Sequence, residues 1–131
     1  MARAVATLLM FDGVADKAMN FYVSLFGDSH IDRIERYGPG EHAAEGTIKV
    51  ADFTLGGHHM KCIDSPIKHN FTFTPSTSIF VECIDEAELE NGFTQLSEGG
   101  AILMPLDNYG FSRRFGWVND RFGVSWQLNL Q

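Results

Sequence analysis

The chain has 131 residues, a hydrophobic fraction of 44% and a formal net charge of −7 at pH 7. This length supports one domain with its own core, and the composition excludes disordered and membrane-embedded classes of protein. The negative charge argues against a nucleic-acid partner, because such binding relies on lysine and arginine side chains that neutralise phosphates.

The first predicted elements are a strand that starts at Thr7 and a helix that follows it. Asp12 ends the apolar run "TLLMF" and no small-residue cleavage site follows. We therefore expect a strand and not a signal peptide, in a cytoplasmic protein. In the next segment apolar residues recur at helical spacing, namely Val14, Ala18, Phe21, Tyr22 and Leu25. We expect this helix to end with Gly27 in the left-handed conformation.

A second segment, which starts at Ser78, repeats the same plan of strand, turn and helix. Asp85 is the expected N-cap of its helix, because Glu88 follows three residues later. Gly99 is expected to end this helix. Such self-similarity predicts a chain built from two related halves.

Three extended segments follow each helix. In the first half they are predicted at about His30–Tyr37, Thr47–Leu55 and His58–Ile63, with Gly56-Gly57 as a tight turn. In the second half they are predicted at about Ala101–Leu106, Arg114–Asn119 and Val124–Leu130, with a turn at "DRFG". The sequence thus predicts a single α+β domain of two βαβββ repeats, about 4–64 and 77–131, joined by a linker at about 65–76. We expect curved, antiparallel-rich sheets around a concave cleft.

The last predicted strand has one apolar and one polar side. Trp126, Leu128 and Leu130 alternate with Ser125, Gln127 and Asn129. The apolar side is expected to pack on the helices, and the polar side to face either the cleft or solvent. We favour the cleft because both halves present comparable faces.

The two cysteines, Cys62 and Cys83, each lie alone in an apolar run. They are expected to be buried free thiols of a reducing compartment. No spacing of cysteine and histidine indicates structural zinc.

Several motifs together resemble one known family. They are "DKAMNFYVSLFG", "FTLGGHHMKCID" and the ending "FGWVNDRFGVSWQLN", and the chain resembles the PhnB-like branch of the vicinal-oxygen-chelate superfamily over essentially its whole length. That superfamily also holds glyoxalase I, extradiol dioxygenases and bleomycin-resistance proteins, and the resemblance implies a homodimer. Similar proteins are often labelled demethylubiquinone methyltransferases. The sequence does not support that label, because no helix is predicted after the glycine-rich segment "YGPGEHAAEG".

Metal-using members of this superfamily carry four ligands, usually His, Glu or Gln. The resemblance places these positions at Thr7, Lys61, Ser78 and Gln127. Hydroxyl and amide groups are weak ligands for zinc and transition metals, and an ammonium group repels a cation. We therefore expect no metal and no cofactor.

The same positions predict a small-molecule site. Its expected ligand-binding residues are Thr7, His59, Lys61, Ser78, Phe80, Gln127 and Asn129, with Phe11, Phe80 and Trp117 as aromatic walls. A few polar groups in an apolar concavity are typical of ligand pockets, and Lys61 favours an anionic or oxygen-rich ligand. The preferred hypothesis is a metal-free binding protein.

Two other hypotheses stay open. One is an enzyme of uncharacterised reaction that uses Lys61 or His59, and it includes the option that His59 and Glu82 hold a metal. A hydrogen-bonded or partly exposed His59 is the simpler expectation. In the other hypothesis, side chains fill the cleft as part of the core, and the protein functions through an interaction surface. No membrane or nucleic-acid partner is expected.

Overall fold

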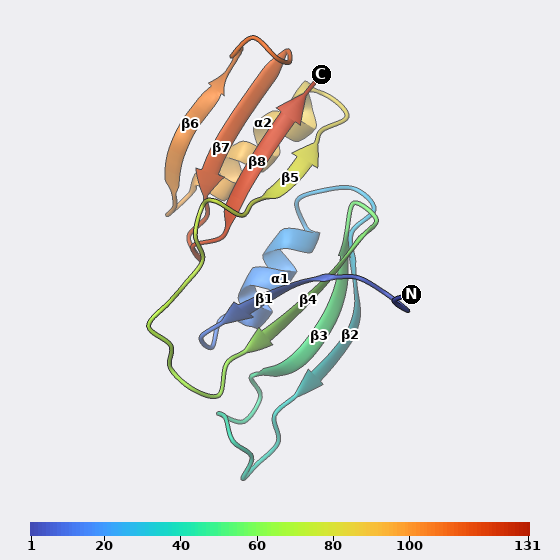
Figure 1. Cartoon of the computed structure of the whole chain (residues 1–131), viewed down its shortest axis with the longest axis vertical. Coiled ribbons are helices and arrows are strands. Elements are labelled where there is room, and N and C mark those ends of the chain that lie inside the picture. Colours follow the sequence, from blue (N-terminus) through green and yellow to red (C-terminus); the bar gives the residue numbers. More distant parts are fainter. The chain divides into compact units, whose positions relative to one another are not determined.

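The computed structural model describes residues 1–131, which divide into two compact units, Met1–His69 and Asn70–Gln131. Each unit contains one four-stranded mixed sheet and one helix (Figure 1). The boundary between the units falls inside the segment 65–76. No helix in the structure is both long and apolar enough to span a membrane.

The first unit contains four strands and one helix in the order strand, helix and three strands. The elements are β1 (Thr7–Phe11), α1 (Ala15–Val23), β2 (His30–Arg36), β3 (Ile48–Leu55) and β4 (His58–Asp64). The strand order is β1-β4-β3-β2, in which β1 runs parallel to β4 and the other pairs are antiparallel. Helix α1 packs against β2, β3 and β4.

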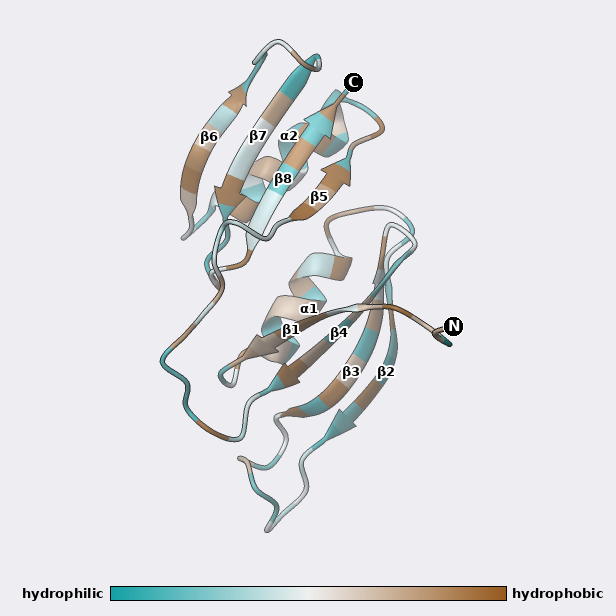
Figure 2. Ribbon diagram, in the orientation of Figure 1, coloured by the Kyte–Doolittle hydropathy of each residue, from teal (hydrophilic) through white to brown (hydrophobic).

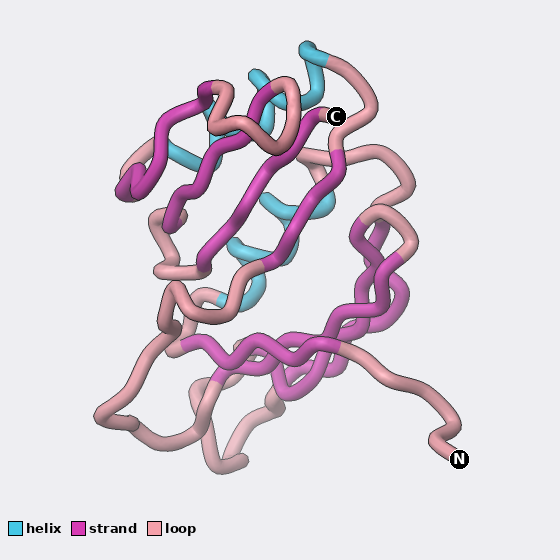
Figure 3. Tube along the Cα trace, turned by 45° about the horizontal axis from the view of Figure 1, so that its top comes forward, coloured by secondary structure: helices cyan, strands magenta, loops and turns pink.

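The second unit repeats this topology. Its elements are β5 (Ile79–Glu82), α2 (Glu86–Ser97), β6 (Ala101–Asp107), β7 (Arg114–Asn119) and β8 (Ser125–Leu130). The strand order is β5-β8-β7-β6, with β5 parallel to β8, and Figure 3 shows the four strands side by side. The predicted α+β class and the βαβββ plan of both halves are therefore confirmed.

Two predicted turns are confirmed by their backbone conformation. Gly56 and Gly57 have φ angles of 53° and 81°, so the β3–β4 connection needs two residues in the left-handed region. Gly123 has a φ angle of 91°, and its N–H bonds the Asp120 carbonyl at 3.0 Å in the "DRFG" turn.

Of the two capping predictions considered next, the one for α2 is confirmed and the one for α1 is wrong. Asp85 is the N-cap of α2, because its carboxylate accepts the N–H of Glu88 at 2.8 Å. The prediction that Gly27 caps α1 in the left-handed region is wrong, because the residue with positive φ is Asp28 (54°). Helix α1 ends earlier because the Ser24 N–H and hydroxyl both turn back to the Phe21 carbonyl, at 3.1 and 2.6 Å.

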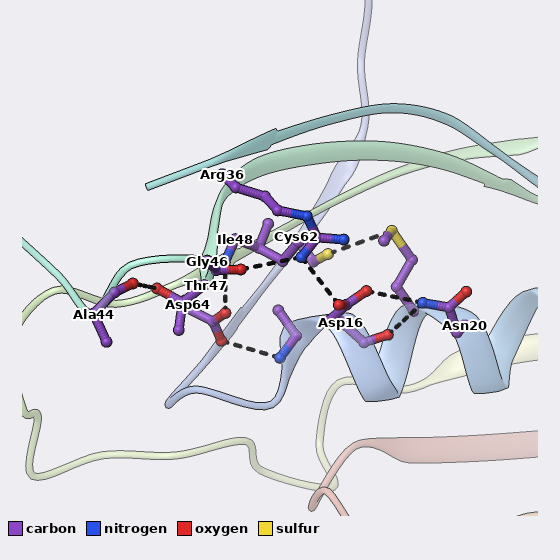
Figure 4. A network of polar contacts seen from close by, with 11 residues as sticks. Asp16, Asn20, Arg36, Ala44, Gly46, Thr47, Ile48, Cys62 and Asp64 are labelled. Atoms are coloured by element: carbon purple, nitrogen blue, oxygen red, sulfur yellow. Dashed lines mark hydrogen bonds and ion pairs between the residues drawn. The ribbon is translucent and has the colours of Figure 1, made fainter. Parts of the chain in front are cut away.

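A buried carboxylate organises the first unit. Asp64, which is 3% exposed, accepts the N–H of Ala15 at 3.0 Å and the N–H of Ile48 at 2.9 Å (Figure 4). Because Ala15 is the first residue of α1 and Ile48 the first of β3, one side chain at the end of β4 fixes both elements. Both carboxylate oxygens are thereby satisfied, as burial of a charged group requires.

The apolar side of β8 forms the core of the second unit. Trp126 and Leu128 are fully buried and Leu130 is 4% exposed, and the alternation with polar residues is visible along β8 in Figure 2. Helix α2 packs on this side of the strand, as the sequence predicted. The polar residues therefore lie on the face away from α2.

Cys62 and Cys83 are both free and buried. Burial raises the pKa of each thiol to about 12. The Cys62 thiol lies 3.9 Å from the sulfur of Met19 in α1. Both cysteines thus serve as core residues, as predicted.

Candidate functional site

Each sheet has one face that its own helix does not cover, which we call the open face. In the second unit, strand pairing places on this face the following residues in or beside β5, β7, β8 and β6: Ser78, Phe80, Glu82, Phe115, Trp117, Asn119, Ser125, Gln127 and Asn129, with Ala101, Met104 and Asp107. In the first unit, the open face includes Asp52, Thr54, His59 and Lys61. The predicted residues His59, Lys61, Ser78, Phe80, Gln127 and Asn129 all lie on the open face of their own sheet.

Four neutral side chains form a hydrogen-bond network on the open face of the second sheet. The hydroxyls of Ser78 and Ser125 are 2.7 Å apart. The indole N–H of Trp117 donates to Ser125 at 2.8 Å, and the amide of Gln127 donates to Ser78 at 3.1 Å. Ser125 is only 1% exposed. The predicted pair Ser78 and Gln127 is therefore brought into direct contact, across the parallel strands β5 and β8.

This network leaves polar groups available to a ligand. One serine must donate to the other, and the two remaining donors, from Trp117 and Gln127, use serine lone pairs. Whichever serine donates, the hydroxyl hydrogen of the other has no partner within the network. Nearby on β7, the buried Oδ1 of Asn119 accepts no hydrogen bond. The open face thus offers one hydroxyl donor.

Asn129 extends the polar groups toward the other end of β8. Its amide donates to Glu82 at 3.0 Å, and its carbonyl oxygen accepts from the Ser112 hydroxyl. Asn129 is 2% exposed, so its side chain is held in one orientation. One of its two amide N–H groups and its carbonyl oxygen are already hydrogen-bonded, so Asn129 mainly supports the open face and Glu82 is its partner.

Aromatic rings lie beside these polar groups. Phe115 is 6% exposed and contacts three other rings, with centroid separations of 5.1 Å to Phe111, 6.1 Å to Tyr109 and 6.4 Å to Phe80. Phe80 and Phe111 are 52% and 59% exposed. Tyr109 and Phe111 come from the β6–β7 connection, and the sequence analysis did not single them out.

The open face of the first sheet is charged instead of neutral. One oxygen of Asp52 contacts Lys61 at 2.7 Å and His59 at 3.0 Å, and the other contacts Arg33 at 3.4 Å. The hydrogen bond from Lys61 is the main cause that lowers the pKa of Asp52 to about 2, with His59 and Arg33 adding to it against the opposing effect of burial. Asp52 was missed in the sequence analysis, although its place opposite Lys61 follows from counting outward from the Gly56-Gly57 turn.

Two predicted site residues lie on the other face of the first sheet. Thr7 pairs in register with Met60, which is fully buried on the α1 side, and its hydroxyl bonds the His58 ring at 3.0 Å. Phe11 pairs with Asp64 and is 5% exposed. The predictions that Thr7 shares a face with Lys61 and that Phe11 forms a wall of the site are therefore wrong, because side chains alternate along a strand and Leu8 is the register partner of Lys61.

The donor set does not fit a metal of the kind that the superfamily uses. Thr7 faces away from Lys61, and the Lys61 ammonium is committed to Asp52. Ser78 and Gln127 bond each other through neutral groups. His59 is paired with Asp52 in one unit and Glu82 with Asn129 in the other. No group of three or more His, Cys, Asp or Glu side chains is arranged to hold a metal ion.

Two βαβββ units with these open faces define the vicinal-oxygen-chelate class of protein. FosX from Listeria monocytogenes, a fosfomycin resistance protein solved with Mn(II) and a dihydroxypropylphosphonic acid, shares this fold with a TM-score of 0.65 at 12% identity, over 98% of this chain and 93% of its own.

Within this class the chain belongs to the PhnB-like family. The family model described as 3-demethylubiquinone-9 3-methyltransferase matches residues 3–129. PhnB protein from Bacillus cereus is 52% identical, with a TM-score of 0.95 over 98% of this chain and all of its own. Protein PA1353 from Pseudomonas aeruginosa is 26% identical, with a TM-score of 0.86 over 99% of this chain and 98% of its own. No curated protein sequence matches the chain.

The fold does not support the methyltransferase part of the family's description. A methyltransferase of the usual kind binds its cofactor at a glycine-rich turn between a strand and a helix of a doubly wound sheet. Here the glycine-rich segment at 38–46 connects two antiparallel strands, β2 and β3, and contains no helix. Both sheets are mixed and carry one helix each.

Proposed function

We propose that this protein binds a small molecule without the help of a metal ion. The observation that carries the proposal is the network of Ser78, Ser125, Trp117 and Gln127, which is oriented by its own hydrogen bonds and borders exposed aromatic rings. A few fixed polar groups among apolar side chains are the usual composition of a ligand site. Because the groups already hold each other in place, little ordering cost is left for binding.

Native mass spectrometry of the protein purified without chelators tests this proposal. We expect a bound molecule of low mass and no stoichiometric metal. Ser78→Ala removes the hydroxyl that joins Gln127 to Ser125, so the bound fraction should fall. Ser97→Ala is the matched control, because the Ser97 hydroxyl bonds the Phe93 carbonyl within α2. One equivalent of zinc, nickel or iron, or equal occupancy in both variants, would contradict the proposal.

A second candidate function rests on the contact between His59 and Asp52. The 3.0 Å hydrogen bond orients the imidazole, as a carboxylate does for a general base. Lys61 is less suited to form an imine, because its nitrogen donates to the same carboxylate at 2.7 Å. As an enzyme, the chain should convert a molecule that contacts the open face of the first sheet, and His59→Gln should abolish this conversion while Asp52 and Lys61 stay in place.

We also propose a homodimer in a reducing compartment such as the cytoplasm. The free, buried state of Cys62 and Cys83 supports the compartment, and the family supports the pairing. Size-exclusion chromatography with light scattering measures the mass in solution. A monomer at micromolar concentration would contradict the dimer.

A further inference from the structure

We infer that the ligand carries a planar aromatic ring without negative charge, which stacks on Phe80 and Phe111 next to the hydrogen-bonding groups of Ser78 and Gln127. This inference rests on the proposed binding function and names the class of ligand.

The rings are fixed in place and yet exposed. Phe115 is the buried member of the cluster, at 6% exposure, and Phe80 and Phe111 are 52% and 59% exposed. Phe111 and Tyr109 meet Phe115 edge to face, at interplanar angles of 69° and 85°. The hydroxyl of Tyr109 donates to the Pro105 carbonyl at 2.6 Å, which holds the β6–β7 connection to β6. Exposed aromatic rings held in this way supply stacking surface at low entropic cost.

Polar groups of the face are buried and aromatic rings of the face are exposed, and this arrangement favours a small molecule over a protein partner. A protein interface has an apolar centre and a polar rim. Here the hydrogen-bonding residues are the buried part, since Ser125 and Asn129 are 1% and 2% exposed, and the rings are the exposed part. Phe80 is the register partner of Gln127, so a molecule that stacks on the ring is also adjacent to the amide.

The charges of the face disfavour an anionic ligand. Asp107, the register partner of Phe115, and Glu82 are both acidic residues on the open face of the second sheet, and the Glu82 carboxylate is two residues from Phe80 on β5. An anionic ring would be repelled by this carboxylate. The serine hydroxyl hydrogen that has no partner within the network suits a hydroxyl or carbonyl oxygen on the ring.

Two probes with the same carbon skeleton and hydroxyl position, one planar and aromatic and the other saturated, test the inference. We expect 2-naphthol to bind and its saturated counterpart, decahydro-2-naphthol, to bind at least fivefold more weakly. A ¹H–¹⁵N NMR titration reports the site directly, because the chain has two tryptophans. The indole N–H of Trp117, which bonds Ser125 on the open face, should shift, whereas that of Trp126, which bonds Asp120 in the core, should not.

Leucine variants separate stacking from general hydrophobic contact. Phe111→Leu and Phe80→Leu keep an apolar side chain and remove the ring face, so each should weaken 2-naphthol binding by about fivefold, as expected for one aromatic pair. Ile84→Ala is the control, because Ile84 is 82% exposed and lies outside the cluster. Its Kd should stay within about twofold, as is usual for a surface change away from the site.

The outcomes that overturn the inference are distinct from those that overturn the proposed function. Equal binding of both probes with a Trp117 shift would refute the aromatic ring and leave a binding site. A Trp126 shift, or none at either indole, would refute the location, while native mass spectrometry still decides whether a ligand is bound. A fall in solution mass in Phe80→Leu or Phe111→Leu would show that a second copy of the chain covers the rings.

Discussion

Replacing Asp52 by asparagine tests whether the charged cluster of the first sheet contributes to stability as its geometry indicates. The pKa of Asp52 falls from its usual 3.8 to about 2, mainly through the hydrogen bond from Lys61. By linkage, this shift corresponds to an upper limit of about 2.5 kcal/mol in the free energy of unfolding at neutral pH. Because the Lys61 and Arg33 side chains are 37% and 57% exposed, solvent screening reduces the expected contribution to about 1 kcal/mol.

The sign of the pH dependence follows from the direction of the shift. A carboxylate with a depressed pKa in the folded state stabilises it fully above the unfolded value, near pH 4, and this contribution is lost as the pH falls through about 2. Urea unfolding, followed by tryptophan fluorescence, measures the free energy of unfolding at pH 7, where the contribution is complete, and at pH 2.5, where most of it is lost. Asp52→Asn should be destabilised at pH 7 and differ from the parent by less than half as much at pH 2.5. An equal difference at both pH values would refute the reasoning.

Three further changes test other parts of the fold. Asp120→Ala removes the acceptor of the Val124 N–H and of the Trp126 indole N–H, so urea unfolding should show a loss of about 3 kcal/mol. Gly116→Ala places a methyl group against the Phe93 ring, and the melting temperature should fall in keeping with a cost of about 1–3 kcal/mol. Burial and the raised pKa of about 12 keep Cys62 unreactive, so iodoacetamide should label it only in urea; rapid labelling of the native protein would contradict this.

Local patterns in the sequence were sufficient to predict most of the fold. The period of two in β8 identified its core side, because apolar side chains must be buried together. The Gly56-Gly57 pair identified the β3–β4 hairpin, because both residues need a positive φ. Asp85 identified the start of α2 through its carboxylate. Each of these signals is local and has one physical cause.

The predictions for the face of Thr7 and the capping role of Gly27 were wrong, because neither residue's conformation follows from the local pattern alone. Thr7 was placed by resemblance to the metal-using members of the superfamily, and a displacement of one residue in a strand moves a side chain to the opposite face. Gly27 was favoured as a cap, but hydrogen bonds of Ser24 ended α1 before the chain reached it.

Part of the site could have been found from the sequence and part could not. Counting outward from the Gly56-Gly57 turn places Asp52 opposite Lys61. Asn119 lies two residues after Trp117 on β7, so their side chains are on the same face of the strand. Tyr109 and Phe111 lie in an irregular connection with no period. Their contacts with Phe115 depend on tertiary structure, so no local pattern predicts them.

The two helices are attached to their sheets by different chemistry, and this has a consequence for how the halves respond to their surroundings. The buried Asp64 holds the start of α1 through backbone N–H groups. Helix α2 is held by Arg114, which bonds Glu86 and Glu90 at 2.6 Å on a partly exposed flank. Molar salt screens an exposed ion pair and barely reaches a buried one. Helix α1 also has one exposed ion pair, between Asp16 and Arg36 at 3.0 Å. Amide hydrogen exchange in added sodium chloride should therefore accelerate more in α2, which has two such pairs, than in α1.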